Sequence, residues 1–529
     1  MNTSFFGLRS ALLGRNFPLF LSFVLSLFLY ACQSETVENK KRPNIVFLMA
    51  DDQRADAFGF MGNPHVITPN LDSLASDGLV FENAYHVAPI CMPSRSSVMT
   101  GQYLGTHRSG FDRPTNYIIT EDEFSSTYPA LLREHGYYTG FIGKFGFAVG
   151  KEEKIKNQNF QDEPEYMPTH HFDVWNGFPG QGSYYPKGGK FNGYQNQWNA
   201  SHLTEFMGYQ AIEFFRKAQD SGKPFCLSIS FKAPHAPFSP AEEFRKKYNG
   251  KKIPRMVNDV PEYYAKLPEV VKEKSRNARW YFGRTEDYYG QHVGYRHDWH
   301  IEVDSIYQEF IKNYYALISG IDNTVGRIRA ELKQLGLDQN TIIIYTSDNG
   351  FFAGSRQLMG KALLYEESVK APMIVFDPAL PKKDELRREN GLISHVDIAP
   401  SILDIAGIKI PENYPGTSFM PIVHQEQHTI HDAVYGENNY DDNYPIATEV
   451  EHPEEYQSIR SKFVITPEYK YIRYHENHPV VEQLYKIGAD SLEEHNIIDE
   501  PDYEDIAREL RSKLNDFEKK YVKSEIEVK

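Results

Sequence analysis

The chain has 529 residues, of which 24% are charged and 40% hydrophobic, a balance typical of a folded globular protein rather than a disordered one. Its formal net charge of −15 argues against general nucleic-acid binding. A site for an anionic substrate would therefore have to be a local basic pocket in an acidic protein. The length allows one large domain and a smaller one.

The first residues have the order of an export signal. Two arginines precede an apolar run over residues 17–31 that ends at Cys32. The sequence Leu-Tyr-Ala-Cys at this point resembles a bacterial lipobox, with cleavage before Cys32 and a lipid on its sulfur. We expect a signal peptide over 1–31, a tether over 32–42, and an exported lipoprotein on the periplasmic or cell-surface side of a membrane. A plain signal peptide and an N-terminal membrane anchor are the alternatives.

Short apolar runs of strand length alternate with helical patterns. The runs cover residues 44–49, 137–142, 225–231, 341–345 and 372–376. They lack strict alternation, which favours strands covered on both faces, as in a parallel α/β sheet. Capping and apolar spacing predict helices over 68–78, 128–135 and 309–336.

The character of the sequence changes after about residue 425. Short strand patterns are followed by a charged helix pattern over residues 502–520. We predict a large catalytic domain over 43–425, with a mixed, mostly parallel sheet between helices, and a small C-terminal α+β subdomain over 426–529 with an antiparallel sheet. The stretches 151–193 and 262–302 are expected to be long loops.

Chemically reactive residues follow four of the predicted strands. They are Asp51 and Asp52, Lys144, His235, and Asp348 with Asn349. Ligands in open α/β sheets bind beyond the carboxyl ends of the strands. The sequence therefore predicts that these side chains share one site.

A compact motif runs from Cys91 through Pro93 to Arg95. Pro93 suits the first turn of a helix that Gly101 would end, which places Cys91 at a helix N-terminus that favours an anion. Arg95 is one turn further along and is expected to point toward the same region. The other cysteines are Cys32 and Cys226, the latter in a predicted buried strand, so we expect no disulfide.

The run Cys91-Met92-Pro93-Ser94-Arg95 resembles the Cys-x-Pro-Ser-Arg signature of the type I sulfatase family, which has an alkaline-phosphatase-like fold. The resemblance implies that a maturation enzyme oxidises Cys91 to formylglycine and that Arg95 holds it. The hydrated aldehyde would attack sulfur, the alcohol would leave, and the sulfated intermediate would collapse to the aldehyde.

Further matches extend the resemblance over residues 43–490. Asp51 and Asp52 stand where the family has its paired metal carboxylates, and Asp348-Asn349 resembles its second pair. With residue 91 they form the implied metal site, whose oxygen ligands suit Ca²⁺ better than Mg²⁺.

Three more residues correspond to the family's sulfate-binding and catalytic groups. Lys144 matches a sulfate-binding lysine, His235 a histidine that contacts sulfate and helps to protonate the leaving alcohol, and Lys361 a lysine that binds the ester oxygen or leaving group.

The chain departs from the family at Gly146. The stretch Gly143-Lys144-Phe145-Gly146 resembles the family's Gly-Lys-Trp-His, whose histidine is the base that collapses the intermediate. His107 and His86 lie near the Cys91 motif, and we take His107 as a hypothetical replacement.

The sequence thus predicts a sulfatase that removes sulfate from a sulfated carbohydrate such as ulvan, carrageenan or a glycosaminoglycan. A phosphonate or phosphodiester hydrolase with the same nucleophile is one alternative. A non-catalytic glycan-binding lipoprotein, suggested by Gly146, is the other. A basic cluster over residues 245–255 is either a further anion site or, by preference, a solvated face.

Overall fold

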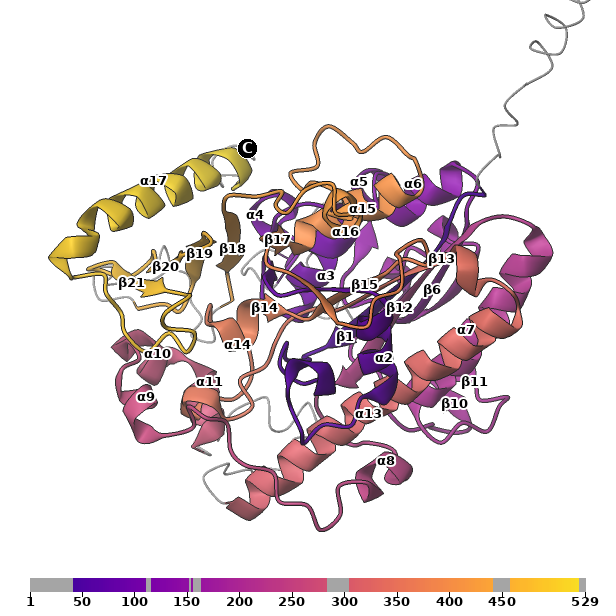
Figure 1. Ribbon diagram of the computed structural model, residues 1–529, viewed down its shortest axis with the longest axis horizontal. Coiled ribbons are helices and arrows are strands. Elements are labelled where there is room, and N and C mark those ends of the chain that lie inside the picture. Colours follow the sequence, from indigo (N-terminus) through magenta and orange to yellow (C-terminus); the bar gives the residue numbers. More distant parts are fainter. Residues whose placement is uncertain are drawn as a thin grey trace, which may run out of the picture. The chain divides into compact units, whose positions relative to one another are not determined.

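The computed structural model describes residues 41–110, 116–151, 154–155, 163–282, 304–440 and 457–522 (Figure 1). The predicted signal peptide, Cys32 and most of the predicted tether lie outside the described residues. In the part of the chain that is described, no helix is both long and apolar enough to cross a membrane.

An eight-stranded sheet is the centre of the molecule. Its order is β16-β2-β15-β13-β1-β12-β6-β9. The strands are β1 Asn44–Asp51, β2 Leu79–Phe81, β6 Tyr138–Lys144, β9 Val174–Phe178, β12 Phe225–Pro234, β13 Thr341–Ser347, β15 Met373–Phe376 and β16 Arg387–Glu389. The strands β13, β1, β12, β6 and β9 pair in parallel, whereas β15 is antiparallel to both of its neighbours. The predicted mixed, mostly parallel sheet is thus confirmed.

Helices cover both faces of this sheet, which explains why its strands are continuously apolar. In β1, Val46 and Leu48 face a core that includes residues of α2 Pro69–Asp77, α7 Leu203–Ser221 and α13 Asp304–Gln334. Ile45 and Phe47 face a second core that includes residues of α3 Cys91–Thr100, α6 Tyr128–Glu134 and α15 Ile398–Ile405. Figure 1 shows α7 and α13 side by side on the first face.

The C-terminal part carries its own antiparallel sheet, as predicted. Its strands are β18 Val434–Asn438, β19 Ser461–Ile465, β20 Tyr469–Tyr474 and β21 Val481–Lys486, in that order. The amphipathic helix α17, Glu504–Tyr521, packs Leu510, Leu514 and Phe517 into a core with residues of this sheet.

The stretches expected to be long loops contain regular elements where the structure describes them. Residues 174–178 form β9, which pairs with β6 at the end of the central sheet. Residues 261–281 form the short helices α9 Pro261–Ala265, α10 Glu269–Lys274 and α11 Arg276–Tyr281. The expectation of loops was wrong there because short elements without a strong apolar period are held by tertiary packing.

Candidate active site

Four neighbouring strands bring the predicted residues to one edge of the sheet. Asp51 ends β1, Lys144 ends β6, His235 follows β12 and Asp348 follows β13. Because β13, β1, β12 and β6 are adjacent and parallel, their carboxyl ends meet. The predicted shared site is therefore formed by the fold.

Three buried carboxylates form the acidic centre of the site. Single ligand oxygens of Asp51, Asp52 and Asp348 all lie within 4.8 Å of one another. The Nδ2 of Asn349 donates to Asp52 Oδ1 at 2.6 Å. Among the described residues, neither Asp51 Oδ1 nor Asn349 Oδ1 has a hydrogen-bond donor, although both atoms are buried.

Three cationic side chains surround the carboxylates. Lys144 Nζ lies 2.6 Å from Asp51 Oδ2, and Arg95 places its Nε 2.7 Å from Asp348 Oδ2 and an Nη 3.2 Å from Asp51 Oδ2. Lys361 Nζ pairs with Asp52 Oδ1. All of these side chains are buried, so the charges interact with little solvent screening.

The carboxylates differ in how easily they ionise. Burial opposes ionisation of Asp51, but the positive charges of Lys144, Arg95 and Lys361 hold its pKa well below the usual value. Burial raises the pKa of Asp52 despite Lys361, and repulsion from Asp51 adds to the rise. Burial and Asp51 also raise the pKa of Asp348. Three close carboxyl groups, two of which resist ionisation in the absence of further positive charge, and two oxygens that lack donors fit a divalent cation with hard oxygen ligands.

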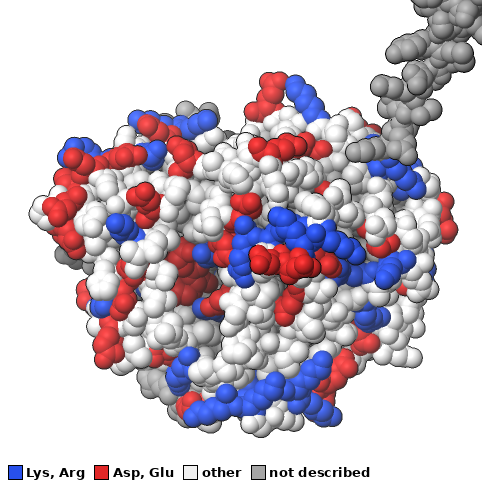
Figure 2. All heavy atoms as spheres, viewed as in Figure 1, with Lys and Arg blue, Asp and Glu red and all other residues white. Residues whose placement is uncertain are grey.

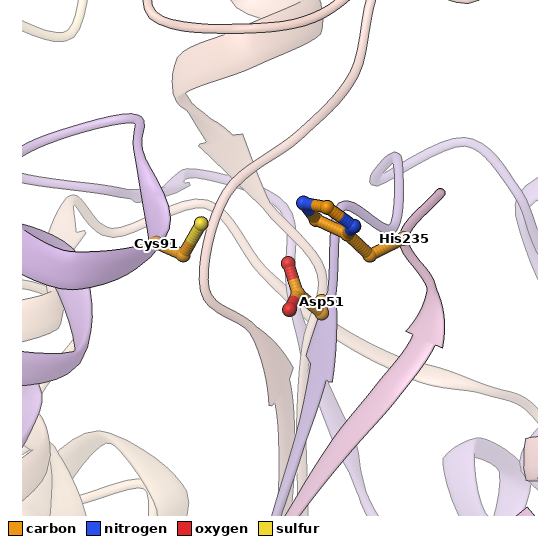
Figure 3. A group of neighbouring side chains, drawn as sticks. All are labelled: Asp51, Cys91 and His235. Carbon is orange, nitrogen blue, oxygen red and sulfur yellow. The ribbon is translucent and has the colours of Figure 1, made fainter. Parts of the chain in front are cut away.

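Cys91 is the first residue of α3, as the motif predicts. Gly101 ends this helix in the left-handed conformation, with φ +66°. The Cys91 side chain is buried, and its Sγ lies 3.1 Å from Lys361 Nζ. Ligand atoms of Cys91, Asp51 and His235 lie within 4.8 Å of one another, and Figure 3 shows the three side chains facing each other.

His235 has a fixed orientation. Its Nδ1 donates to the Ala236 carbonyl at 2.7 Å, which leaves Nε2 as an acceptor 3.8 Å from Asp52 Oδ2. Burial, aided by the nearby lysines, holds the pKa of His235 well below its usual value. The neutral ring therefore presents an unprotonated Nε2 to the site.

Comparisons with known proteins match this arrangement. The sulfatase family model matches residues 43–408, and the model of the C-terminal part of N-sulphoglucosamine sulphohydrolase matches residues 354–520. The chain belongs to the sulfatase family. It is a sulfuric ester hydrolase, and members of this family generally use a metal ion and a formylglycine.

Individual relatives cover nearly the whole sulfatase chain. An N-acetylglucosamine-6-O-sulfatase of Bacteroides thetaiotaomicron is 27% identical over 94% of this chain and 90% of its own length. An ulvan-active sulfatase of Formosa agariphila is 24% identical over 94% of this chain and 86% of its own. A solved complex of a protein with its substrate D-glucosamine-2-N,6-O-disulfate has a TM-score of 0.70 and 26% identity, and covers 91% of this chain and 98% of that one.

Arg95 occupies the space that the side chain of the family's histidine would need at position 146. Gly146 has φ +88°, a conformation that favours glycine, and a Cβ added there would lie 2.5 Å from Arg95 Cδ. Arg95 has little freedom to move away, because its guanidinium also donates to the Lys144 carbonyl at 2.8 Å. In this sulfatase the backbone conformation and the position of Arg95 therefore accommodate glycine at position 146 and leave no room for a larger residue.

We accordingly expect Gly146→His to impair the enzyme instead of restoring a family feature. Backbone strain and displacement of Arg95 should lower the free energy of unfolding by about 1–3 kcal/mol and reduce turnover. Urea unfolding and initial rates on an aryl sulfate measure both effects. Gly146→Ala, the control for the Cβ alone, should show most of the stability loss. A histidine variant faster than the wild type would contradict this account.

The two histidines considered as replacements form local contacts, although His86 Nε2 has no hydrogen-bond partner among the described residues. His107 Nδ1 accepts from the Ser109 amide at 3.0 Å, and its Nε2 lies 2.9 Å from the Ser97 hydroxyl. His86 Nδ1 lies 3.2 Å from His395 Nδ1. The hypothesis that His107 is the missing base loses its support, because both ring nitrogens are used in local contacts that do not reach the acidic centre.

Lys232, near the end of β12, was not predicted from the sequence as a residue of the site. It is buried, and its Nζ donates to the Ala236 carbonyl at 3.0 Å, the same oxygen that fixes His235. Burial, together with repulsion from Lys144, lowers the pKa of Lys232 to about 7. A lysine inside a strand with no other charged residue was the signal in the sequence. Gln181, which accepts from Lys144 Nζ at 2.8 Å, had no such signal.

We expect Lys232→Met to stabilise the protein and slow the enzyme. The folded pKa of Lys232 lies below the usual value of 10.5, so its burial cost is complete below about pH 7 and falls as the pH rises toward 10. The free energy of unfolding of the variant should thus exceed that of the wild type by on the order of 2 kcal/mol at pH 6 and by little near pH 10. Turnover should fall about tenfold, because the carbonyl that orients His235 is no longer held by Lys232. Urea unfolding at several pH values and initial rates test this, with exposed Lys409→Met as control. A pH-independent difference would refute it.

The basic cluster at residues 245–255 lies on the surface around α8, Glu242–Lys246. Figure 2 shows a band of basic side chains along the lower edge of the molecule, over α8 and the segment that follows it. Within the cluster, Lys246 lies 3.6 Å from Glu242 and Arg255 lies 2.8 Å from Asp259. These neutralising contacts fit the preferred prediction of a solvated face.

Proposed function

We propose that this sulfatase removes sulfate from a sulfated polysaccharide or oligosaccharide, and that a formylglycine made from Cys91 is its nucleophile. The observation that carries the proposal is the position of Cys91. Its Sγ lies 3.1 Å from Lys361 Nζ and shares one cluster with Asp51 and His235. Among the described residues Cys91 is a free, buried cysteine, so no disulfide competes with this role.

The surrounding side chains have distinct tasks in this proposal. A formylglycine hydrate at position 91 would supply the hydroxyl that attacks sulfur. Lys144, Arg95 and Lys361 offset the negative charge of the transferring sulfo group. The unprotonated Nε2 of His235 can accept the proton that the attacking hydroxyl loses and pass it to the departing alcohol.

Asp51, Asp52, Asp348 and Asn349, with residue 91, would hold the metal. Their oxygen donors favour Ca²⁺ over Mg²⁺, which demands a stricter geometry. Such an ion polarises a sulfate oxygen. The fit rests on the two donorless oxygens and on the raised pKa values of Asp52 and Asp348.

Removal of the metal provides a separate prediction. Dialysis against a chelator should lower turnover at least about a hundredfold, and added Ca²⁺ should restore it better than Mg²⁺. Released sulfate is the measurement, and the protein's metal content is determined in parallel. Full activity in metal-free protein would exclude this role for the carboxylates.

The proposed substrate class follows from what the relatives act on. Those with high coverage include the N-acetylglucosamine-6-O-sulfatase and the ulvan-active sulfatase, and the solved complex holds a sulfated glucosamine. A panel of defined oligosaccharides from ulvan, carrageenan and glycosaminoglycans, with 6-O-sulfated N-acetylglucosamine as its first member, identifies the substrate by released sulfate. Failure of every member would refute a saccharide substrate.

The phosphonate and phosphodiester alternative is tested directly by substrate preference. Phosphonate monoester hydrolases of Agrobacterium radiobacter and Silicibacter pomeroyi share the fold, with TM-scores of 0.68 and 0.69 at 21% and 20% identity. We expect the protein to prefer 4-nitrophenyl sulfate to a 4-nitrophenyl phosphodiester. The opposite preference would indicate that the substrate is a phosphodiester or phosphonate and not a sulfate ester.

Export and lipidation complete the proposal. The apolar run over residues 17–31 and the lipobox-like end at Cys32 support a bacterial lipoprotein on the periplasmic or cell-surface side of a membrane. Radiolabelled palmitate should be incorporated by the wild type and lost in Cys32→Ser. Equal labelling of both proteins would refute lipidation at this residue.

A further inference from the structure

A short loop connects the Lys144 side of the candidate active site to the His235 side. It covers residues 179–183, between Phe178, the last residue of β9, and Tyr184. Phe178 is paired with Lys144 where β9 lies beside β6. At the other end of the loop, the buried Tyr184 donates its hydroxyl to the His235 carbonyl at 2.6 Å. The loop is therefore tied at both ends to residues of the candidate active site.

Gln181 is the middle residue of this loop. The glycines on either side of it, Gly180 and Gly182, have φ of +61° and +62°, a conformation that favours glycine. A Cβ added to Gly182 would lie 2.5 Å from a ring carbon of Phe178, so a larger residue would have to displace that ring. The two glycines thus allow a tight turn that brings the Oε1 of Gln181 to 2.8 Å from Lys144 Nζ.

Only one end of the Gln181 amide is used within the protein. A lysine ammonium group can only donate, so the amide oxygen faces Lys144 and the Nε2 points elsewhere. In the parts of the chain that the structure describes, this Nε2 has no hydrogen-bond acceptor, and it is not among the buried polar atoms. Gln181 as a whole is half-buried. Its two N–H donors are therefore accessible to a ligand, next to a lysine that corresponds to the family's sulfate-binding group.

Lys144 lies deeper in the protein than Gln181. Its side chain is buried, and its Nζ contacts Asp51 Oδ2 at 2.6 Å as well as Gln181. Two of the three ammonium donors are thus used, and one remains for a sulfate oxygen. A sulfo group held by the buried cations would leave the rest of the ester to extend toward solvent. Because Gln181 is the more exposed of the two residues, it lies toward that outer part of the substrate.

We propose that Gln181 is a substrate-binding residue, and that its Nε2 donates to a hydroxyl or ring oxygen of the saccharide that carries the sulfate. This inference rests on the proposed function, because the contact is made to the sugar of the proposed substrate class. A site that hydrogen-bonds a substrate oxygen discriminates against a substrate that lacks it. Gln181 therefore favours sulfated saccharides over aryl sulfates, whose ring carries no such oxygen beside the ester.

The test compares two substrates of the full-length enzyme. The kcat/KM is measured for 4-nitrophenyl sulfate and for the sulfated saccharide that the wild type hydrolyses fastest, with 6-O-sulfated N-acetylglucosamine tried first. The ratio of the saccharide value to the aryl sulfate value isolates the sugar contact, because both substrates share the sulfo group and any effect that acts through Lys144.

Two variants of Gln181 should lower this ratio. Gln181→Met has a similar length but no amide, and we expect the ratio to fall about five- to tenfold through a higher KM for the saccharide. Gln181→Glu keeps an oxygen for Lys144 but replaces the donor by an acceptor, and the ratio should fall at least about tenfold. Gln195→Glu makes the same charge change at an exposed position of β11, Tyr194–Gln195, and should leave the ratio unchanged.

Two outcomes would count against the proposals, and they differ. An unchanged ratio in both Gln181 variants would overturn the contact to the sugar. This includes the case in which both substrates slow equally, because Gln181 would then act only through Lys144. A wild type that hydrolyses the aryl sulfate but no saccharide would instead refute the proposed substrate class, and the sugar contact with it.

Discussion

Cys91→Ala is expected to abolish turnover while leaving the protein folded. Removing the covalent nucleophile from a site of this kind lowers the rate on the order of a thousandfold or more. The fold should tolerate the change, because Lys361 keeps its ion pair with Asp52 and the side chain lost is small. The free energy of unfolding should therefore change by no more than about 1 kcal/mol. Initial rates on 4-nitrophenyl sulfate and urea unfolding are the measurements.

Cys226→Ala is the matched control, because Cys226 is also a free, buried cysteine but lies within β12. It should lose some stability through the cavity it leaves and keep its turnover. If Cys91→Ala retained the activity or the full biological effect of the wild type, the enzymatic role of position 91 would be excluded. A full biological effect in a variant without turnover would favour the interpretation as a non-catalytic glycan-binding protein.

Asp51→Asn should remove both the metal and most of the activity. The carboxylate of Asp51 contacts Lys144 and Arg95 and carries one of the donorless oxygens. Neutralising it should lower turnover on the order of a hundredfold or more. Because two buried cations lose the carboxylate that they share, we also expect the free energy of unfolding of the metal-free protein to fall by about 3 kcal/mol.

Three measurements separate these effects. Metal content by elemental analysis reports binding, initial rates report catalysis, and urea unfolding with and without Ca²⁺ reports stability. Asp505→Asn on α17 is the control, because its side chain is 91% exposed and remote from the sheet edge. A variant of Asp51 with normal metal content and normal rates would show that this carboxylate is not part of the centre.

The sequence was sufficient to predict the central sheet and the main site because strong local patterns determine both. Apolar runs without alternation indicate strands covered on both faces, and reactive residues after these runs, such as Asp51 and Asp348, mark the carboxyl ends of those strands. The direction of β15 could not be predicted in this way, since an apolar run is the same whether its strand is parallel or antiparallel. The short helices between residues 261 and 281 were missed because tertiary contacts, not local pattern, hold them.

The contributions of single side chains were harder to predict. That Gly146 lies against Arg95, and that the ring nitrogens of His107 are both engaged, depends on contacts between segments far apart or on exact side-chain geometry. Lys232 was visible as a charge within an apolar strand but lacked a motif.

The chemical identity of residue 91 is the most direct test of the whole account. Protein from the native host, or from a host that contains the maturation enzyme, is digested, and the peptide that spans residues 91–95 is analysed by mass spectrometry. We predict that the peptide carries an aldehyde oxygen in place of the sulfur of Cys91. A peptide that always retains the thiol, in protein that still releases sulfate, would contradict the proposed nucleophile.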